Sequence, residues 1–100
     1  MDETTLFSII AAAGTARSAY IEAIEMAKKG DFDQAQALIA DGEQAFLQGH
    51  DAHTKLVQKA ASGEQVSADI LLVHAEDQLM SAEQFRILSE QFIDVYRRIS

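Results

Sequence analysis

Two glycine-containing breaks divide this chain of 100 residues, which contains no proline. The breaks are KKGD at 28–31 and ASGEQVS at 61–67. The three segments between and beside them are rich in Ala, Glu, Gln and Lys, which favour helices. Apolar residues recur in each segment at helical spacing. The sequence therefore predicts three long helices and no sheet.

The predicted helices have recognisable ends. The first begins near Asp2–Thr4, any of which could cap it, and ends at Lys28–Lys29, whose charges suit the negative end of the helix dipole. The second opens at Asp31, a good N-cap, and the third starts after Ser67 and continues to about Ile99. Long helices joined by short loops fold as an antiparallel bundle. We therefore expect residues 1–100 to form one all-α domain, an antiparallel three-helix bundle.

Each predicted helix carries an apolar stripe that is expected to face the core. In the first helix the stripe is Leu6, Ile10, Ala13, Tyr20, Ile24 and Ala27. In the second it is Ala35, Leu38, Gly42, Ala45, Phe46, Gly49, Leu56 and Ala60. Its small residues would let another helix approach closely. In the third, one face holds Ile70, His74, Asp77, Ser81, Leu88, Phe92, Val95 and Ile99.

The third helix carries more apolar surface than one thin bundle buries. The stretch Ile70–Val73 is apolar through almost a full turn, and Val73, Met80 and Ile87 form a second stripe. A helix that is apolar in most directions is buried in most directions. We therefore expect a homo-oligomer that buries the start of the third helix.

His74 and Asp77 interrupt the apolar start of the third helix. On the predicted core face a carboxylate is costly unless it is paired, protonated or bound to a cation. The helix has no lysine or arginine before Arg86. In a symmetric oligomer, copies of Asp77 could converge on the axis and hold a divalent cation. A satisfied core histidine, hydrogen-bonded locally to the aspartate, is the simpler alternative.

Three other side chains are weaker candidates for function. His50 and His53 have the spacing of a weak metal site, although a solvated polar face explains them more simply. Arg17 lies on the core-facing side of the first helix. There it is expected to snorkel, to pair with a carboxylate or to hold a phosphoryl group.

The charge and cysteine content exclude several functions. A net charge of −8 disfavours nucleic acid and anionic membranes as partners, whereas basic proteins fit better. Without cysteine there is no disulfide, thiolate nucleophile or cysteine metal site. The first residues, MDETTLFSII, are acidic where a signal peptide is basic, and no apolar run approaches the roughly 18 residues of a membrane span. We expect a cytoplasmic protein without direct membrane insertion.

The motif LLVHAEDQLM at 71–80 resembles the enzyme IIA component of the lactose/cellobiose (N,N'-diacetylchitobiose) family of the bacterial phosphoenolpyruvate-dependent sugar phosphotransferase system. The likeness extends over GTARSAYIEAIEMAKKGDFDQAQALIADG at 14–42 and AHTKLVQKAASGE at 52–64. It implies three-helix subunits in a homotrimer, with a phosphorylated histidine at His74 and a metal-binding aspartate at Asp77. The implied cofactor is a divalent cation at the trimer axis, with Mg²⁺ expected first. The implied partners are HPr, which phosphorylates His74, and enzyme IIB, whose cysteine receives the group.

Two neighbours of His74 depart from the usual pattern of that family. The usual residues are Gln at the position of Glu76 and a second His at the position of Gln78. Glu76 places a negative charge near the dianionic phosphoryl group and is expected to raise the energy of phospho-His74. Gln78 can still donate a hydrogen bond. These departures leave the phosphoacceptor in place but bear on the transfer rate.

Two other functions fit parts of the sequence. A histidine phosphotransfer module of a two-component relay is also helical, but it would place its histidine on an exposed helix face with lysine nearby. A non-catalytic interaction module is suggested by AKKGDFDQAQALIADGEQAF at 27–46, which resembles half of a tetratricopeptide repeat. Such repeats need several stacked copies, and one is present.

Overall fold

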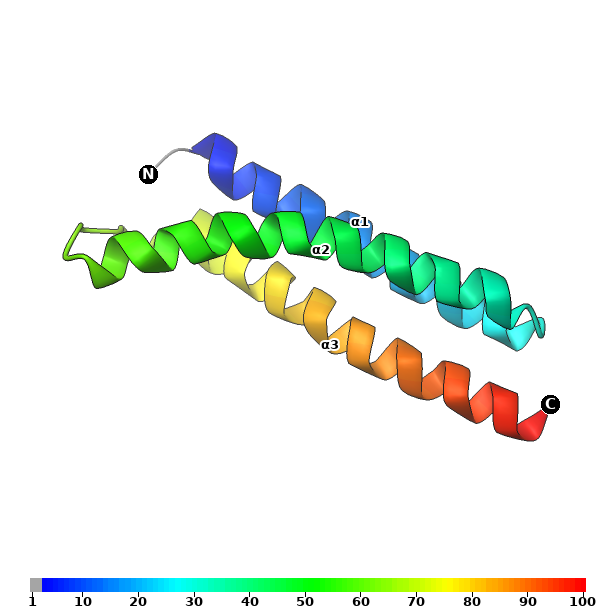
Figure 1. Cartoon of the computed structure of the whole chain (residues 1–100). Coiled ribbons are helices and arrows are strands. Elements are labelled where there is room, and N and C mark those ends of the chain that lie inside the picture. Colours follow the sequence, from blue (N-terminus) through cyan, green and yellow to red (C-terminus); the bar gives the residue numbers. More distant parts are fainter. Residues whose placement is uncertain (1–2) are drawn as a thin grey trace.

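The computed structural model describes residues 3–100 and folds them into three helices, which are α1 (Glu3–Lys28), α2 (Phe32–Ala61) and α3 (Ile70–Ile99) (Figure 1). They form a rod of 52 × 19 × 19 Å in which successive helices run in opposite directions. The predicted all-α, three-helix architecture is confirmed. Asp2, a predicted capping residue of the first helix, lies outside the described residues.

The turn between α1 and α2 forms as its sequence predicts. Gly30 has a φ of +83°, a left-handed conformation that glycine adopts without strain. Its N–H donates to the carbonyl of Ala27, and the N–H of Asp31 donates to Met26, which satisfies the last carbonyls of α1. Oδ1 of Asp31 accepts the N–H of Gln34 at 3.1 Å. Asp31 is therefore the N-cap of α2, as expected.

The second connection, residues 62–69, is longer, and α3 begins slightly later than predicted. Its N-cap is Asp69, whose Oδ1 accepts the N–H of Leu72 at 2.9 Å. An aspartate at this position satisfies an orphan N–H and also places a negative charge at the positive end of the helix dipole. The helix therefore starts two residues beyond the position expected from Ser67.

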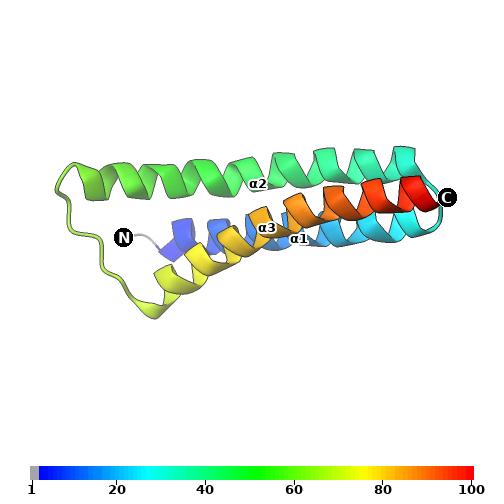
Figure 2. The same ribbon diagram turned by 90° about the horizontal axis from the view of Figure 1, so that it is seen from below.

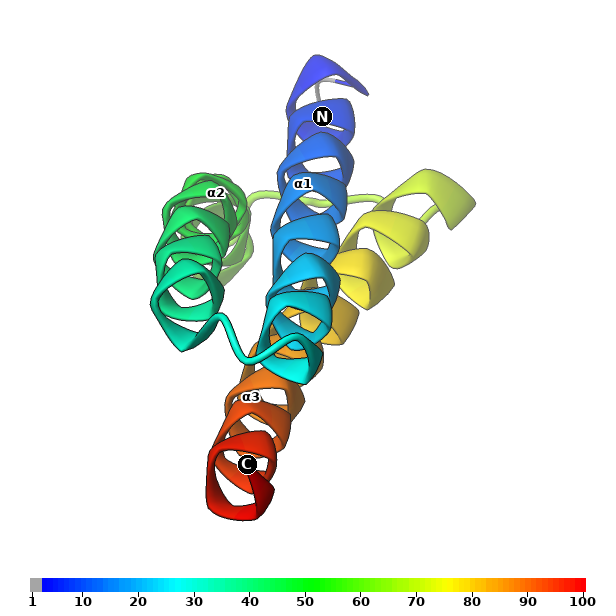
Figure 3. The same ribbon diagram turned by 90° about the vertical axis from the view of Figure 1, so that its right-hand side faces the viewer.

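α1 is the central element of the bundle. Figure 3 shows it between α2 and α3, and Figure 2 shows α3 inclined to the other two helices. The core of the described part of the chain consists of Leu6, Ile9, Ala13, Ala16, Tyr20, Ala23 and Ala27 from α1, of Ala35, Leu38, Ile39 and Leu56 from α2, and of Leu72, Ala75, Leu79, Ala82 and Ile93 from α3. Most of the two predicted stripes on α1 and α2 is buried. The exceptions are Ile10, Ile24, Ala45 and Phe46, which are half-buried, and Ala60, which is exposed.

The predicted core face of the third helix is wrong. His74 and Asp77 are exposed, as are all the large apolar residues of that face: Ile70, Leu88, Phe92, Val95 and Ile99. α3 instead turns a face with small residues toward α1, whose buried face is also rich in alanine. Two such faces approach closely and pack densely. The bulky residues of α3 therefore remain uncovered within one chain.

Glycine lets α1 and α2 pack closely in the middle of the bundle. The ring of Tyr20 lies where a side chain at Gly42 would start, because a Cβ built there would be 2.5 Å from Cε1 of Tyr20. A Cβ built at Gly49 would be 3.2 Å from both Ala12 and Leu79. The expectation that small residues of the second helix allow close approach is confirmed.

We predict that Gly42→Ala destabilises the protein although alanine favours helices. The new methyl group must displace the buried Tyr20 ring, and overpacking of this kind costs about 1–3 kcal/mol. The gain in helix propensity offsets about 1 kcal/mol of this. Gly14→Ala is the matched control, since a Cβ there has no atom within 4 Å and should stabilise α1. Urea unfolding measures both, and equal shifts in the two variants would contradict the packing.

The Tyr20 hydroxyl should make stability depend on alkaline pH. It is fully buried and has no hydrogen-bond partner within residues 3–100. Burial, reinforced by the negative charge of Glu43, raises the pKa of Tyr20 to about 12 from an ordinary value of 10.0. The folded state holds the Tyr20 proton more tightly than the unfolded state does, and this difference stabilises the folded state. The stabilisation is complete below pH 10 and is lost as the pH rises toward 12.

We therefore expect the free energy of unfolding to fall by on the order of 2 kcal/mol across this interval through Tyr20. Chemical unfolding of the native protein and of Tyr20→Phe at several pH values measures this fall. Tyr20→Phe should be at least as stable at neutral pH, because it removes an unpartnered buried hydroxyl. An identical alkaline fall in both proteins would exclude Tyr20 as its source.

Candidate functional site

His74 lies in the second turn of α3 with its side chain exposed. It lines a shallow groove of about 400 Å³ on the face of α3 that the other two helices leave uncovered. The groove is lined by Ile70, Val73, His74, Glu76, Asp77 and Met80. An imidazole nitrogen at this position is open to a large partner and surrounded by both apolar and acidic groups.

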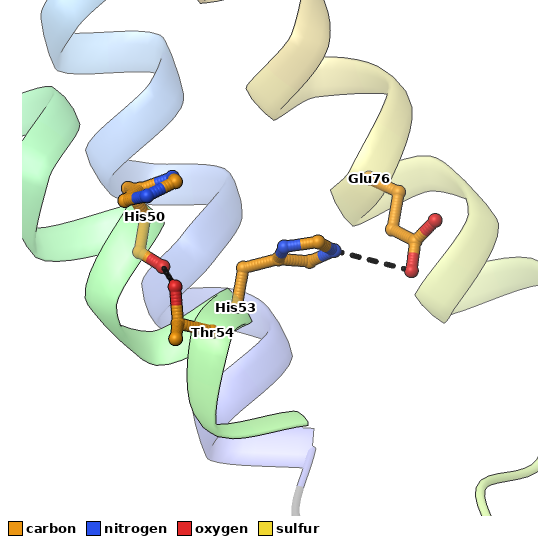
Figure 4. A network of polar contacts seen from close by, with 4 residues as sticks. All are labelled: His50, His53, Thr54 and Glu76. Carbon is orange, nitrogen blue, oxygen red and sulfur yellow. Dashed lines mark hydrogen bonds and ion pairs between the residues drawn. The ribbon is translucent and has the colours of Figure 1, made fainter. Parts of the chain in front are cut away.

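Glu76, at one edge of the groove, contacts His53 on α2. Nε2 of His53 lies 3.3 Å from Oε1 of Glu76, and Figure 4 shows the His53 ring reaching across from α2 to this carboxylate. A carboxylate only accepts hydrogen bonds, so Nε2 of His53 carries the proton in this contact. The Glu76 charge is therefore directed toward α2. It should raise the energy of phospho-His74 less than the position of Glu76 in the sequence suggests.

Gln78 contacts α1 on the other side of the site. Nη1 of Arg17 donates a hydrogen bond to Oε1 of Gln78 at 2.7 Å, and both side chains are half-buried. Arg17 thus pairs with a neutral amide, not with the carboxylate that was one of its expected partners. Gln78 serves as an acceptor through its oxygen, and its amide N–H groups remain available as donors.

Asp77 lies in the same groove as His74 and is exposed, so it needs no cation within one chain. Within residues 3–100, no three side chains of the types that bind metals cluster closely enough to hold an ion. A metal site built on Asp77 would therefore need ligands from other copies of the chain.

The two histidines of α2 engage different neighbours. The His50 ring stacks on Phe46, with 5.8 Å between ring centroids, and its backbone carbonyl accepts the hydroxyl of Thr54 at 2.9 Å. The His53 ring lies apart from it, against Glu76 (Figure 4). The contact from His53 to the groove was not foreseen, because the spacing of His50 and His53 gives no sign of a partner on another helix. Arg17 was foreseen as a candidate, but its partner was not.

The chain matches the family described as the lactose/cellobiose-specific IIA subunit of the phosphotransferase system over residues 4–97. It is 38% identical over 96 residues to the oligo-beta-mannoside-specific EIIA component of Bacillus subtilis. This match covers 96% of this chain and 87% of the relative. Its structure is similar to the crystal structure of the cellobiose-specific enzyme IIA from Bacillus anthracis, with a TM-score of 0.95 and 35% identity. That match covers 99% of this chain and 93% of the other.

A second structural neighbour was solved with a partner. It is the IIA(chitobiose) protein of the Escherichia coli N,N'-diacetylchitobiose branch, in a complex with HPr. The TM-score is 0.85 at 28% identity, and the match covers 99% of this chain and 97% of the other. In the described part of this chain, no helix is long and apolar enough to cross a membrane.

The exposure of His74 removes one of the two arguments from sequence against a two-component phosphotransfer module. The extent of the family match decides between an enzyme IIA, a two-component phosphotransfer module and a tetratricopeptide-like module. The match spans all three helices and includes the LLVHAEDQLM motif. Half of a tetratricopeptide repeat would account for the first two helices alone. The chain belongs to the lactose/cellobiose-specific enzyme IIA family of the sugar phosphotransferase system.

Proposed function

We propose that this protein is a phosphocarrier that accepts a phosphoryl group from phospho-HPr on His74 and passes it to the cysteine of a matching enzyme IIB. The observation that carries the proposal is the exposed imidazole of His74 within the family motif, in a groove that a macromolecular donor can reach. The HPr complex of the chitobiose relative supports the choice of donor. A cytoplasmic location fits such partners.

The transfer needs a neutral imidazole. A lone pair on a His74 ring nitrogen attacks the phosphorus of phospho-HPr, and a new N–P bond forms while the N–P bond to the HPr histidine breaks. The electron pair of the broken bond returns to the HPr imidazole. In the second step the thiolate of enzyme IIB attacks the same phosphorus and releases His74. Transfer between two histidines is close to isoenergetic, so catalysis depends on positioning and on charge stabilisation.

We further propose that three copies assemble through the uncovered face of α3. The support is the row of large apolar side chains that one chain leaves exposed. They are Ile70 at 88%, Val73 at 58%, Met80 at 56%, Ile87 at 48%, Leu88 at 53%, Phe92 at 47%, Val95 at 49% and Ile99 at 72%. An apolar face that runs the length of α3 is typical of a helix that packs against its own copies. Assembly would place apolar side chains of neighbouring subunits beside His74 and limit the access of water to phosphohistidine.

Asp77 lies on this face, so the proposed trimer would bring three carboxylates together. A hard divalent cation such as Mg²⁺ would neutralise them, because carboxylate oxygens are the ligands it prefers. Asp77 of each subunit would hold it. The chemistry it would supply is neutralisation of like charges between subunits, while the phosphoryl transfer depends on His74 and its neighbours.

We predict that Asp77→Leu leaves the assembled protein at least as stable as the native one, because it removes converging like charges and adds apolar contact. Thermal unfolding with Mg²⁺ and with a chelator measures the effect. Mg²⁺ should raise the melting temperature of the native protein and leave that of Asp77→Leu unchanged. Loss of the fold in Asp77→Leu, or an equal response to Mg²⁺ in both proteins, would refute the axial site.

The phosphocarrier proposal is tested by reconstituting the relay. The protein is incubated with phosphoenolpyruvate, enzyme I and HPr, and its intact mass is followed before and after addition of the matching enzyme IIB. We expect a gain of one phosphoryl group that mild acid removes, followed by its loss to enzyme IIB. A folded protein that gains no phosphoryl group would favour the interaction-module alternative.

A further inference from the structure

Among the described residues, Arg17 differs from the other arginines because it is half-buried and has no carboxylate partner. Arg97 also lacks one, but it is exposed and lies over the ring of Phe32. Arg86 lies within an ion-pair distance of Glu43, and Arg98 of Asp94. Within residues 3–100, Arg17 forms no ion pair, and its hydrogen-bond partner is the neutral amide of Gln78. A half-buried guanidinium without a carboxylate is unusual in a protein with a net charge of −8.

The Arg17 guanidinium has donors to spare. It carries five N–H groups, and the contact with Gln78 uses one of its nitrogens. Arginine binds phosphate through pairs of such donors and keeps its charge at every physiological pH. A partly desolvated guanidinium with free donors and no counterion has the chemistry of an anion site. The anion that the proposed function supplies is the phosphoryl group.

The contact with Gln78 places this charge next to His74. Residues four apart on a helix are surface neighbours, with Cβ atoms about 5–6 Å apart. Because side chains on a helix lean toward its N-terminus, Gln78 lies over the turn that carries His74. The 2.7 Å hydrogen bond from Arg17 to Oε1 of Gln78 therefore holds the guanidinium on the side of α3 where the imidazole projects.

The two edges of the site then differ in charge. On the side of α2, the Glu76 carboxylate is engaged by His53 at 3.3 Å. On the side of α1, Arg17 contributes a positive charge that is paired with no carboxylate of residues 3–100. A dianionic group on His74 would be attracted toward Arg17.

We propose that Arg17 is a catalytic residue that contacts the phosphoryl group on His74, and that Gln78 is the residue that positions it. This inference rests on the proposed function. In a loose phosphoryl-transfer transition state, negative charge is spread over the equatorial oxygens, and a guanidinium held in place beforehand stabilises it without reorganisation. Gln78, which stands where the family usually has histidine, orients Arg17 through its carbonyl oxygen.

The test compares the rates of His74 phosphorylation at saturating phospho-HPr. We expect Arg17→Gln to lower this saturated rate about 100-fold, as for loss of one charge-stabilising donor. Arg17→Lys should recover part of the rate, because it keeps the charge but loses the planar fork. Gln78→Met, which keeps the volume and removes the acceptor, should slow transfer less than Arg17→Gln. Adding Gln78→Met to Arg17→Gln should cause little further loss.

Arg97→Gln is the matched control. It removes the same charge from the same chain, but Arg97 lies over the ring of Phe32, about 35 Å from His74 along α3 at about 1.5 Å per residue. Its rate should stay within about twofold of the native rate, since a rim charge far from the phosphoryl group is screened. Circular dichroism and thermal unfolding show whether each variant is folded.

An unchanged saturated rate in folded Arg17→Gln would overturn the inference. An effect confined to the phospho-HPr concentration needed for half-saturation would also overturn it, because Arg17 would then serve docking. If Arg17→Gln does not fold, the saturated rate of Gln78→Met is compared with that of the native protein. A slower rate would support the inference, and an unchanged rate would overturn it. Failure of the native protein to accept a phosphoryl group would overturn the proposed function together with this inference. The reaction of the native protein therefore tests the proposed function, and the reactions of the variants test the role of Arg17.

Discussion

Replacing His74 by alanine should abolish phosphoryl uptake completely. The ring nitrogen is the nucleophile of the proposed transfer, and alanine offers no atom that can replace it. The side chain is exposed and forms no hydrogen bond within residues 3–100, so the fold should be unaffected. Intact mass after incubation with phosphoenolpyruvate, enzyme I and HPr should show one added phosphoryl group on the native chain and none on His74→Ala.

The other two histidines provide internal controls for this result. His50→Ala should accept the phosphoryl group at the native rate, because the His50 ring stacks on Phe46 away from the groove. His53→Ala should also accept one group, but more slowly, since the Glu76 carboxylate loses its partner beside the site. Uptake by His74→Ala, or complete loss in His50→Ala, would move the phosphoacceptor away from His74.

A single charge on the uncovered face of α3 should dissociate the assembly. Phe92 is 47% exposed in one chain, so Phe92→Glu leaves the subunit fold intact. In the proposed trimer the same change would bury three carboxylates without partners, and each such burial costs several kcal/mol. Light scattering should report a native particle of about three chains. For Phe92→Glu it should report one chain of 11.0 kDa.

Ala11→Glu is the control for this experiment. It adds the same charge at an exposed position in the groove between α1 and α2, away from the uncovered face of α3. We expect it to remain assembled. A native protein that is a stable monomer at micromolar concentration would refute the trimer, and so would a Phe92→Glu protein that keeps the native mass.

The fold was predictable because its signals are local. Gly30 and Asp31 mark the first turn through their own backbone preferences, and these act independently of the rest of the chain. The face of α3 was not predictable in the same way. Its bulky stripe and its alanine-containing stripe are both apolar, and the choice between them depends on how closely α1 can approach. That distance is set by residues far away in the sequence.

The site was predictable in part for a related reason. His74 and its neighbours on α3 are adjacent along one helix, so the motif itself identifies them. Their partners come from other helices, Arg17 from α1 and His53 from α2. A contact over 61 residues, such as that from Arg17 to Gln78, leaves no periodic signal in a single sequence. The electrostatic balance of the groove therefore becomes visible only in the folded chain.

The central claim is that His74 carries the phosphoryl group, and the ring nitrogens of the histidines test it most directly. The chain has three histidines, so a nitrogen-edited NMR spectrum of the native protein can follow each ring before and after phosphorylation by HPr. We predict that one ring nitrogen of His74 shifts strongly and couples to phosphorus, while the rings of His50 and His53 keep their patterns. Phosphorus coupling at His50 or His53, or at no histidine in a protein that has gained the mass, would contradict the account.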